Sequence, residues 1–348
     1  MNSWPIDRII ICTDAPRGKG LAHYYYLALR DIIGEQKVLI VNDGDRNYNS
    51  HRWIRALRRA RRELGILSNH RLTQIQERLL PARNVVLLFN NADMLPQHIR
   101  ILSENPGVFL VNYLSDSPMG IIPSLRANII SGIKYCHLIG TFATDLIPVL
   151  YQTGARKVVR IPFGYCKYTH QQPAEQIPVS LPDKVVYFGT WSSEIEDWLL
   201  PLTKFDFQIE GNGWERSRHD ALVKLGTSKE KHMDQKMVVL ARKAGVVVNF
   251  TRAMHGCFHT MKTFELAIAG ACVVTNYSAE QSEFFRNGQS VNYFNTALEM
   301  IGLVERLLND REYAMAIRQG ARESAIGNSY HERSQQLLEL IAAEVPWL

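Results

Sequence analysis

The sequence lacks any long apolar run. Its longest wholly apolar segments, such as Val85 to Phe89, are far shorter than the ~20 residues that a membrane-spanning helix requires. The run Ile9 to Cys12, which follows Asp7 and Arg8, is also too short for the hydrophobic core of a secretory signal peptide. We therefore expect no transmembrane helix and a cytoplasmic location.

Cysteine is scarce, and its pattern is not that of a disulfide protein. The five cysteines form an odd set without a Cys-x-x-Cys pair, which excludes a disulfide framework and indicates free thiols in a reducing compartment. The chain also has no low-complexity tract and no internal repeat, which excludes solenoids and propellers.

The composition is that of an ordinary globular chain. Hydrophobic residues make up 46% and charged residues 21% of the 348 positions, which excludes disordered and fibrous classes. The length suggests about two domains. Forty basic against 34 acidic residues leave a net charge of +6, which favours anionic ligands such as phosphates, acidic lipid or nucleic acid without choosing among them.

Runs rich in Val, Ile and Leu alternate with segments of helical periodicity, which is typical of parallel strands buried on both faces. Six runs lie in the first half: Arg8–Thr13, Lys37–Asn42, Asn84–Asn90, Gly107–Tyr113, Tyr135–Gly140 and Lys157–Pro162. Five lie in the second half: Lys184–Gly189, Asp206–Gly211, Gly245–Asn249, Ala271–Asn276 and Ser290–Phe294. The pattern predicts an α/β fold of two doubly wound, Rossmann-like domains, with ligands beyond the carboxyl ends of the strands and in a cleft between the domains.

The domain boundaries follow from the gap between these two sets. Residues 167–183 contain three prolines and no clear periodicity, which indicates a linker. We therefore predict an N-terminal domain over residues 1–166 and a C-terminal domain over residues 184–328. The last segment, 329–348, contains the helical stretch Tyr330–Glu344, which either crosses back to brace the first domain or is an ordinary terminal helix.

The most informative stretch runs from Lys262 to Asn276. Helix-forming and small residues lead to Gly270, which is suited to ending a helix, and a buried strand follows at once. Glu265 is an isolated acid in that helix. A lone glutamate on a helix is usually a solvated surface residue.

This stretch resembles the donor-binding half of GT-B glycosyltransferases, and it is most similar to their spore-maturation-protein (CgeB-like) branch. The resemblance extends from about Val185 to about Arg333. Its segments are Tyr187–Thr190, Ile209–Trp214, Val247–Arg252, Lys262–Ala271, Glu280–Gly288, Leu307–Asp310, Gly320 and His331. It implies a GT-B architecture whose first domain serves the acceptor and whose second domain binds the nucleotide sugar.

The resemblance assigns Glu265 to the ribose hydroxyls of the donor nucleotide. A carboxylate accepts two hydrogen bonds at once, which suits a diol. Arg252 and Lys262 would neutralise the diphosphate, and Gly256 would let the backbone approach it, although both cations also suit surface ion pairs. The expected substrate-binding set further includes His255, Thr263, Asn249, Gly189, Thr190, Gly18, Lys19 and Gly20.

Two departures from the GT-B pattern bear on the mechanism. Cys257 stands where many retaining members have an additional glutamate, eight positions before Glu265. Thr190 and Trp191 stand where many members have an arginine. We therefore do not infer for this chain the particular arrangement of residues that those members use for a retaining transfer.

His255 and His259 have a spacing that metal ligands also use. The glutamate of the zinc motif His-Glu-x-x-His is absent, and no second cluster completes a ligand set, so zinc is disfavoured. The resemblance also implies catalysis without a bound metal. We expect no cofactor, with the nucleotide sugar acting as a co-substrate.

The loop from Thr13 to Gly20 follows the first expected strand and is rich in glycine. His23 occupies the place of the third glycine of a dinucleotide-binding motif, and the loop does not have P-loop spacing. A Rossmann dehydrogenase is therefore disfavoured. Gly18, Lys19 and Gly20 either close over the diphosphate or an anionic acceptor, or form a plain solvent-exposed turn.

Asp14, His23 and Asp116 follow strand signals and are candidate catalytic bases. An inverting transfer needs a base within hydrogen-bond reach of the acceptor hydroxyl, whereas a front-face retaining transfer needs none. Each of the three side chains also suits a helix cap.

The segment Arg52–Arg62 places its arginines on one helical face. This face either touches anionic lipid as a weak peripheral membrane contact or, as we favour, simply lies in solvent. No nucleic-acid-binding module is found, so nucleic acid is not an expected partner.

The sequence thus predicts a hexosyltransferase-type glycosyltransferase that moves a sugar from a nucleoside-diphosphate donor to a hydroxyl acceptor. The alternative is a non-catalytic GT-B relative that acts as a nucleotide-binding or assembly protein. Neither the acceptor nor the oligomeric state is specified by the sequence.

Overall fold

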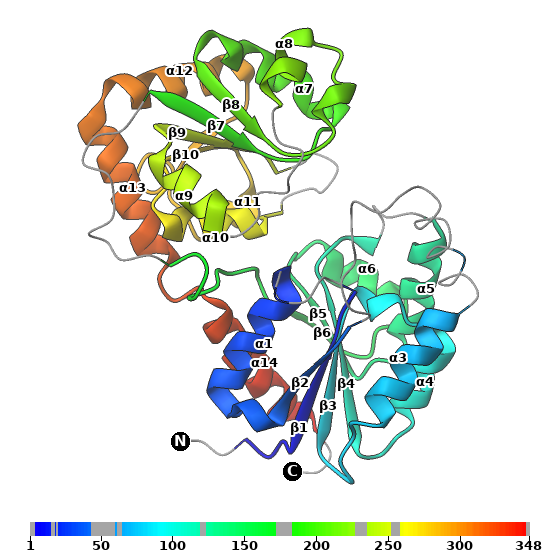
Figure 1. The fold of residues 1–348 in the computed structure, drawn as a ribbon. Helices are drawn as coiled ribbons and strands as arrows, with labels where there is room; N and C mark the ends of the chain where they lie inside the picture. Colours follow the sequence, from blue (N-terminus) through cyan, green and yellow to red (C-terminus); the bar gives the residue numbers. More distant parts are fainter. Residues whose placement is uncertain are drawn as a thin grey trace. The chain divides into compact units, whose positions relative to one another are not determined.

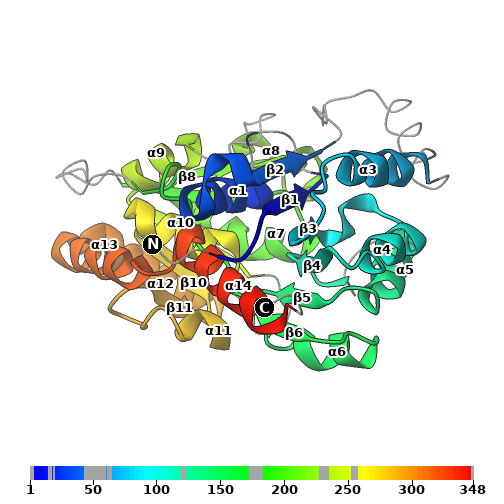
Figure 2. The ribbon, with the colours of Figure 1, turned by 90° about the horizontal axis from the view of Figure 1, so that it is seen from below.

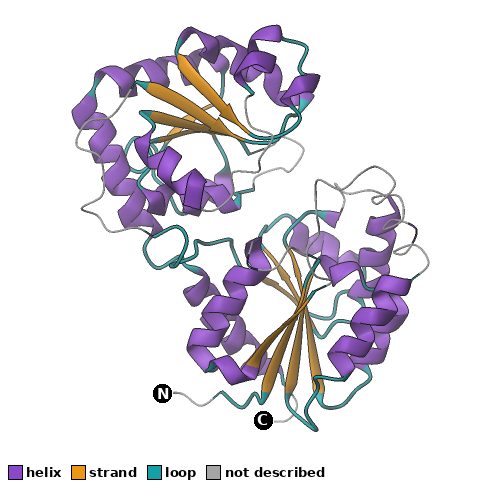
Figure 3. Cartoon of the chain, in the orientation of Figure 1, coloured by secondary structure: helices purple, strands orange, loops and turns teal. Residues whose placement is uncertain are grey.

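The computed structural model describes residues 4–14, 18, 20–42, 60, 65–118, 123–171, 183–226, 235–251 and 258–345. The chain divides into two compact units (Figure 1). Unit 1 combines Met1–Pro162 with Tyr330–Leu348, and unit 2 is Phe163–Ser329. Within the described residues, each unit contains a parallel sheet flanked by helices, which confirms the predicted α/β fold with two Rossmann-like domains (Figure 3).

Unit 1 is built on a six-stranded sheet with the order β2-β1-β3-β4-β5-β6. Its central strands β3 and β4 are buried along their whole length, as expected where helices cover both faces of a parallel sheet. The strands are β1 (Arg8–Cys12), β2 (Val38–Val41), β3 (Asn84–Phe89), β4 (Val108–Leu114), β5 (Leu138–Thr141) and β6 (Val158–Arg160). The helices before the crossing to unit 2 are α1 (Gly20–Ile33), α3 (Ile66–Gln76), α4 (Pro96–Ser103), α5 (Pro123–Ile133) and α6 (Leu146–Gln152), with the short turns η1 (Glu35–Lys37) and η2 (Asn90–Asp93).

Helix α14 (Tyr330–Glu344) follows unit 2 in the sequence but packs in unit 1 (Figure 2). Its Tyr330 ring stacks on Tyr24 of α1, with 5.4 Å between the ring centroids. Further along, Gln336 Nε2 donates a hydrogen bond to the carbonyl of Arg160, at the end of β6 (3.3 Å). The terminal helix therefore completes the packing of the first unit.

Unit 2 is built on a five-stranded sheet with the order β11-β10-β9-β7-β8. The strands are β7 (Lys184–Phe188), β8 (Asp206–Glu210), β9 (Val246–Asn249), β10 (Val273–Asn276) and β11 (Asn292–Phe294). The helices are α7 (Ser193–Leu199), α8 (Asp220–Leu225), α9 (Gln235–Lys243), α10 (Met261–Ala269), α11 (Ala279–Ser282), α12 (Ala297–Asn309) and α13 (Arg311–Ala325), with the turns η5 (Leu200–Lys204) and η6 (Trp214–Arg216). All eleven strand-like runs of the sequence form strands, with small shifts at their ends.

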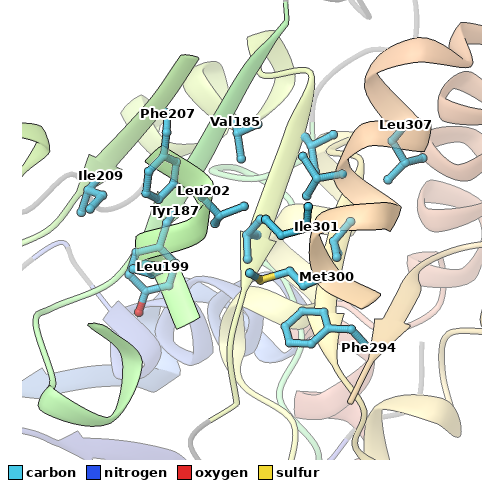
Figure 4. Close-up of a cluster of buried hydrophobic side chains, with 14 of the residues drawn as sticks. Val185, Tyr187, Leu199, Leu202, Phe207, Ile209, Phe294, Met300, Ile301 and Leu307 are labelled. Atoms are coloured by element: carbon cyan, nitrogen blue, oxygen red, sulfur yellow. The ribbon is translucent and has the colours of Figure 1, made fainter. Parts of the chain in front are cut away.

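The core of unit 2 forms where alternate residues of the strands meet helices on one face of the sheet. Val185 and Tyr187 of β7 pack with Leu202 of η5 and with Met300 and Leu307 of α12 (Figure 4). These residues have period two in the strand and helical spacing in α12, which is the pattern expected of a sheet covered by helices.

The crossing from unit 1 to unit 2 falls at Pro162, earlier than the boundary at residue 166 expected from the sequence. The physical reason is backbone bonding to unit 2: Tyr165 N–H donates to the carbonyl of Asn328 (3.2 Å). Gly164 permits this approach, because a Cβ at that position would lie 2.5 Å from the same oxygen. Residues 172–182 of the expected linker lie outside the described residues.

Arg318 of α13 is a buried cation that joins two helix ends, and it is 1% exposed. Its guanidinium donates hydrogen bonds to the carbonyls of Arg242 (3.1 Å) and Ala244 at the end of α9, and to Gly245 (3.3 Å). It also donates to the carbonyl of Gly270, which ends α10 (2.7 Å). A cation suits these carbonyls because the C-terminus of a helix carries partial negative charge.

We predict that Arg318→Met lowers the free energy of unfolding of unit 2 by about 3 kcal/mol, because buried carbonyls lose charged donors. Urea denaturation followed by tryptophan fluorescence measures this change. Arg286→Met, at an exposed position, is the control and should change the free energy by less than about 0.5 kcal/mol. Equal effects of the two substitutions would contradict the assignment.

Candidate donor site

Helix α10 carries three of the residues for which donor chemistry is predicted, Lys262, Thr263 and Glu265 (Figure 1). It begins after Thr260, whose backbone N–H donates to Thr263 Oγ1 (3.1 Å), and it ends at Gly270, whose φ of +80° favours glycine. Residues 264–269 are all buried. A helix that follows a parallel strand begins at the carboxyl end of that strand, so α10 starts at the edge of the sheet where ligands bind in this class of fold.

Glu265 lies on α10 and is only 6% exposed, so it differs from most lone glutamates on helices, which are solvated surface residues. One oxygen of its carboxylate, Oε1, lies 3.7 Å from Nε2 of His170. His170 comes from the segment that enters unit 2, and it is fully buried. A buried carboxylate and a buried imidazole therefore face each other within unit 2.

The backbone selects the tautomer of His170. The N–H of Cys166 donates to His170 Nδ1 (2.9 Å), so the ring proton of the neutral form lies on Nε2, on the side of Glu265. Burial lowers the pKa of His170 to about 4. If Nδ1 carried a proton, its N–H would face the backbone N–H of Cys166, and the two donors would repel each other. His170 is therefore a neutral hydrogen-bond donor at neutral pH.

His259, considered above as a metal ligand, is buried in a second pair. Its Nε2 accepts from the N–H of Phe163 (3.0 Å), and its Nδ1 lies 2.9 Å from Oε2 of Glu280 on α11. Both side chains are almost fully buried. Because Nε2 is an acceptor, Nδ1 carries the proton and donates it to Glu280. The ring thus links the entry segment of unit 2 to α11.

Lys262 brings a cation to the carboxyl edge of the sheet. Its Nζ donates to the carbonyl of Phe188, the last residue of β7 (2.5 Å). Gly189 and Thr190 follow directly, and Gly189 is held by Trp214, whose indole N–H donates to the Gly189 carbonyl (2.9 Å). The turn after β7 and the start of α10 are therefore connected by the lysine side chain.

Trp191 follows Thr190 at the place where many GT-B enzymes have arginine. Its backbone N–H donates to the carbonyl of Asn212 (2.9 Å), and its indole N–H donates to Glu196 Oε1 (2.5 Å). The guanidinium of Arg216 lies over its ring, 4.2 Å from the centroid. A guanidinium is thus present beside this turn, although it comes from η6.

Asn249 and Thr263 line a small pocket. Asn249 ends β9, and Thr275 lies beside it on β10. Asn249 Oδ1 and Thr275 Oγ1 are buried and make no hydrogen bond within the described residues. The pocket has a volume of about 10 Å³, which is room for one water molecule. Thr263 Oγ1 also donates to Gln281 Oε1 (3.1 Å).

The three candidate bases lie in unit 1 at its carboxyl edge. Asp14 follows β1, Asp116 follows β4, and His23 lies in the first turns of α1, where its ring stacks on Tyr26 at 6.0 Å. Asp116 is exposed, and its Oδ2 accepts a hydrogen bond from Asn90 Nδ2 (3.2 Å).

Gly18 and Gly20 both have positive φ, +74° and +76°, as a tight turn into α1 requires.

The turn η2, next to Asp116, has an unusual backbone. Its four residues, Asn90–Asp93, have φ values of 48°, 59°, 49° and 59°, a left-handed conformation that costs about 1–2 kcal/mol per residue without glycine. Two asparagines compensate: Asn91 N–H donates to Asn112 Oδ1 (3.1 Å), and Asn112 Nδ2 donates to Asn91 Oδ1 (2.5 Å). The turn thereby presents Asn90 to Asp116.

Several predicted site residues lie outside the described residues. They are Lys19, Arg252, His255 and Gly256, together with Cys257 and nearly all of the arginine-rich segment 52–62. Among the side chains that are described, no three His, Cys, Asp or Glu residues group as a metal site needs. No helix in the described ranges has the length and apolar character needed to cross a bilayer.

His170 is a functional candidate that the sequence did not reveal, and Glu280, the buried partner of His259, was not singled out either. His170 falls within the expected linker, and nothing in its neighbours signals a partner on α10. Glu280 begins the Glu280–Gly288 segment of the resemblance, which assigns it no role. A buried histidine in an otherwise polar turn is visible only once the chain is folded, because the contact joins residues far apart in the sequence.

A model of a protein family described as glycosyl transferase-like matches residues 193–339. This region begins at α7, contains α10 with Glu265, and ends within α14. A search of curated proteins found no match.

Solved structures resemble nearly the whole chain at low sequence identity, and they show a GT-B fold. HepE of Anabaena in complex with UDP and glucose has a TM-score of 0.66 and 14% identity, covering 97% of this chain and 99% of that one. Sucrose-phosphate synthase of Thermosynechococcus elongatus has a TM-score of 0.66 and 11% identity, covering 96% and 98%. The N-terminal domain of trehalose-6-phosphate phosphatase of Candida albicans has a TM-score of 0.64 and 12% identity, covering 97% of both chains.

The state of His170 leads to a prediction about stability and pH. Its pKa is about 4 in the folded protein and ~6.5 in an unfolded chain, so the unfolded state binds more protons between these values. Stability from neutral His170 is therefore present above pH ~6.5 and is lost as the pH falls toward 4, by up to about 1.4 kcal/mol per pH unit.

We expect the difference in unfolding free energy between wild type and His170→Gln to shrink over that range, as measured by urea denaturation at pH 7, 6, 5 and 4. His170→Asn, which also does not titrate, is the control and should show the same trend. A difference that stays constant or grows toward pH 4 would mean that the folded protein carries a protonated His170.

Proposed function

We propose that this chain is a glycosyltransferase that moves a sugar from a nucleoside-diphosphate donor to a hydroxyl acceptor. The observation that carries the proposal is the buried Glu265 carboxylate on α10, beside the carboxyl edge of the unit 2 sheet. The glycosyl transferase-like match spans this helix, and HepE, which has the same fold, was solved with UDP-glucose. The similarity to the spore-maturation branch is part of the same proposal.

Glu265 binds the ribose in this proposal. A carboxylate with little solvent access accepts hydrogen bonds from both ribose hydroxyls without competition from bulk water. The alternative role, a surface residue of the helix, does not explain why the side chain is buried against an imidazole. Binding the nucleotide in this way fixes the direction in which its diphosphate leaves the ribose.

The diphosphate is neutralised by protein cations, without a bound metal. Lys262 lies one turn before Glu265 and holds its ammonium group at the end of β7, where its positive charge suits phosphate oxygens. Arg252 and Gly256, in the loop before α10, complete this site in the proposal. Positive charge at this position stabilises the leaving nucleoside diphosphate as the glycosidic bond breaks.

The acceptor is activated in unit 1. Asp116 is the preferred base for an inverting transfer, because it is exposed at the carboxyl edge and is held by Asn90. Asp14 and His23 are the other two candidates. In a retaining front-face transfer, none of these residues acts as a base.

The second candidate function is a nucleotide-binding or assembly protein without catalysis. Cys257, at the position where many retaining members have a glutamate, favours it. Further elements of the proposal are a hexose donor, a cytoplasmic location and, through segment 52–62, a weak membrane contact.

Glu265 provides the central test. We expect one member of a panel of UDP, GDP, dTDP, CMP and ADP sugars to raise the melting temperature and to be turned over with release of the nucleotide. Glu265→Gln should lower kcat/KM by about 10- to 100-fold, since hydrogen bonds to a charged group contribute about 1.5–3 kcal/mol. Glu312→Gln, at an exposed position of α13, is the control. Binding without nucleotide release would favour the non-catalytic alternative, and no binding would refute both.

Lys262 provides a second test, based on charge. Lys262→Met should weaken binding of the nucleoside diphosphate by about 10-fold or more, because an ammonium facing a phosphate contributes at least about 1.4 kcal/mol. Binding of the corresponding nucleoside, which has no phosphate, should not change. Lys262→Arg keeps the charge and should retain most of the affinity. Isothermal titration calorimetry of wild type and both variants measures these binding constants, and equal loss of affinity for both ligands in Lys262→Met would exclude a role at the diphosphate.

A further inference from the structure

The segment that enters unit 2, residues 163–171, lies against the candidate ribose site. His170 in this segment and Glu265 on α10 are 0% and 6% exposed, and His170 Nε2 is 3.7 Å from Glu265 Oε1. This distance is a few tenths of an ångström beyond the length of a hydrogen bond. The pair is therefore close to a bonded geometry. Hydrogen bonds in binding sites often shorten when the ligand binds.

The direction of the interaction is set by the protein backbone. Because Cys166 N–H donates to Nδ1, the proton of His170 is on Nε2 and is directed at the carboxylate. The imidazole is therefore a donor toward Glu265 and an acceptor toward the backbone. Neither role can be exchanged without breaking the Cys166 bond.

The segment itself is fixed independently of any ligand. Phe163 N–H donates to His259 Nε2 (3.0 Å), and Tyr165 N–H donates to the carbonyl of Asn328 (3.2 Å). His259 is in turn held by Glu280. With its backbone anchored at these points and its ring anchored at Nδ1, His170 loses little further freedom when Glu265 binds a ligand.

A neutral hydrogen-bond donor such as His170 suits a carboxylate that binds its ligand in the charged form, as Glu265 does in the proposal. A carboxylate has about four lone-pair positions on its two oxygens. A donor on Oε1 fixes the rotation of the group, which sets the direction in which its oxygens face the ribose hydroxyls. A neutral donor does this without forming an ion pair that would compete with the ligand.

We propose that His170 is a positioning residue that orients the Glu265 carboxylate toward the ribose hydroxyls of the donor nucleotide. This inference rests on the proposed function, in which Glu265 binds the ribose. It adds a residue of the entry segment to the donor site, although that residue itself need not touch the donor.

Two substitutions of His170 distinguish the acceptor role of Nδ1 from the donor role of Nε2. The amide of Asn reaches about as far as Nδ1, so His170→Asn keeps an acceptor for Cys166 N–H but has no donor near Glu265. The longer Gln side chain places an amide near Nε2, so His170→Gln keeps the donor. Glu265→Gln is the reference variant for loss of the carboxylate.

The experiment compares binding of UDP with binding of 2′,3′-dideoxy-UDP to the full-length protein, using calorimetry. Wild type should prefer UDP by about 10- to 100-fold, the range expected for hydrogen bonds to a charged group. Glu265→Gln should reduce this preference to nearly one. His170→Asn should reduce it at least threefold, with unchanged affinity for the dideoxy nucleotide, whereas His170→Gln should largely retain it.

The outcomes separate this inference from the proposed function. If Glu265→Gln abolishes the preference and His170→Asn leaves it intact, the positioning role is refuted while the ribose assignment stands. If His170→Asn weakens both ligands equally, its role is structural and the inference fails. If wild type shows no preference, or does not bind UDP, the ribose assignment for this nucleotide fails, and the positioning role fails with it.

Discussion

The burial of a carboxylate is the constraint on which the donor site depends. Removing an anionic group from water is costly unless donors replace the lost hydration. Unit 2 buries two glutamates next to histidines, Glu265 beside His170 and Glu280 beside His259. In each pair the backbone of the entry segment donates to one ring nitrogen, so the other nitrogen carries a proton toward the acid. The same short segment therefore organises both sites.

The two pairs differ in what their geometry permits. His259 and Glu280 are in direct hydrogen-bond contact at 2.9 Å and are packed among aromatic rings, including Phe264 and Phe284. This is the arrangement of a structural link. His170 and Glu265 are further apart, and Glu265 lies on the helix that begins at the carboxyl edge of the sheet. The first pair has therefore already formed its hydrogen bond, whereas the second pair is still short of one.

The fold could be predicted from the sequence because its signals are local. Residues Asn84–Phe89 are buried throughout and have the composition of a strand, and Gly270 marks the end of α10 with a φ that other residues rarely adopt. Lys262 and Glu265 were found by resemblance, and the structure adds their burial and contacts. His170 could not be found, because the polar and proline-rich character of its surroundings indicates a linker, whereas its role comes from a partner far away in sequence. The left-handed turn at Asn90–Asp93 was equally hidden, since none of its residues is glycine.

The packing of α14 in unit 1 makes unit 2 an insertion in the topological sense. The chain leaves unit 1 after Pro162 and returns at Tyr330, and the two crossings lie next to each other where Tyr165 pairs with Ser329. Cutting the chain at both crossings would therefore give a unit 2 fragment with neighbouring ends, a geometry that also suits circular permutation. A single cut after residue 329 would instead leave an N-terminal fragment whose first sheet has lost the helix that covers α1.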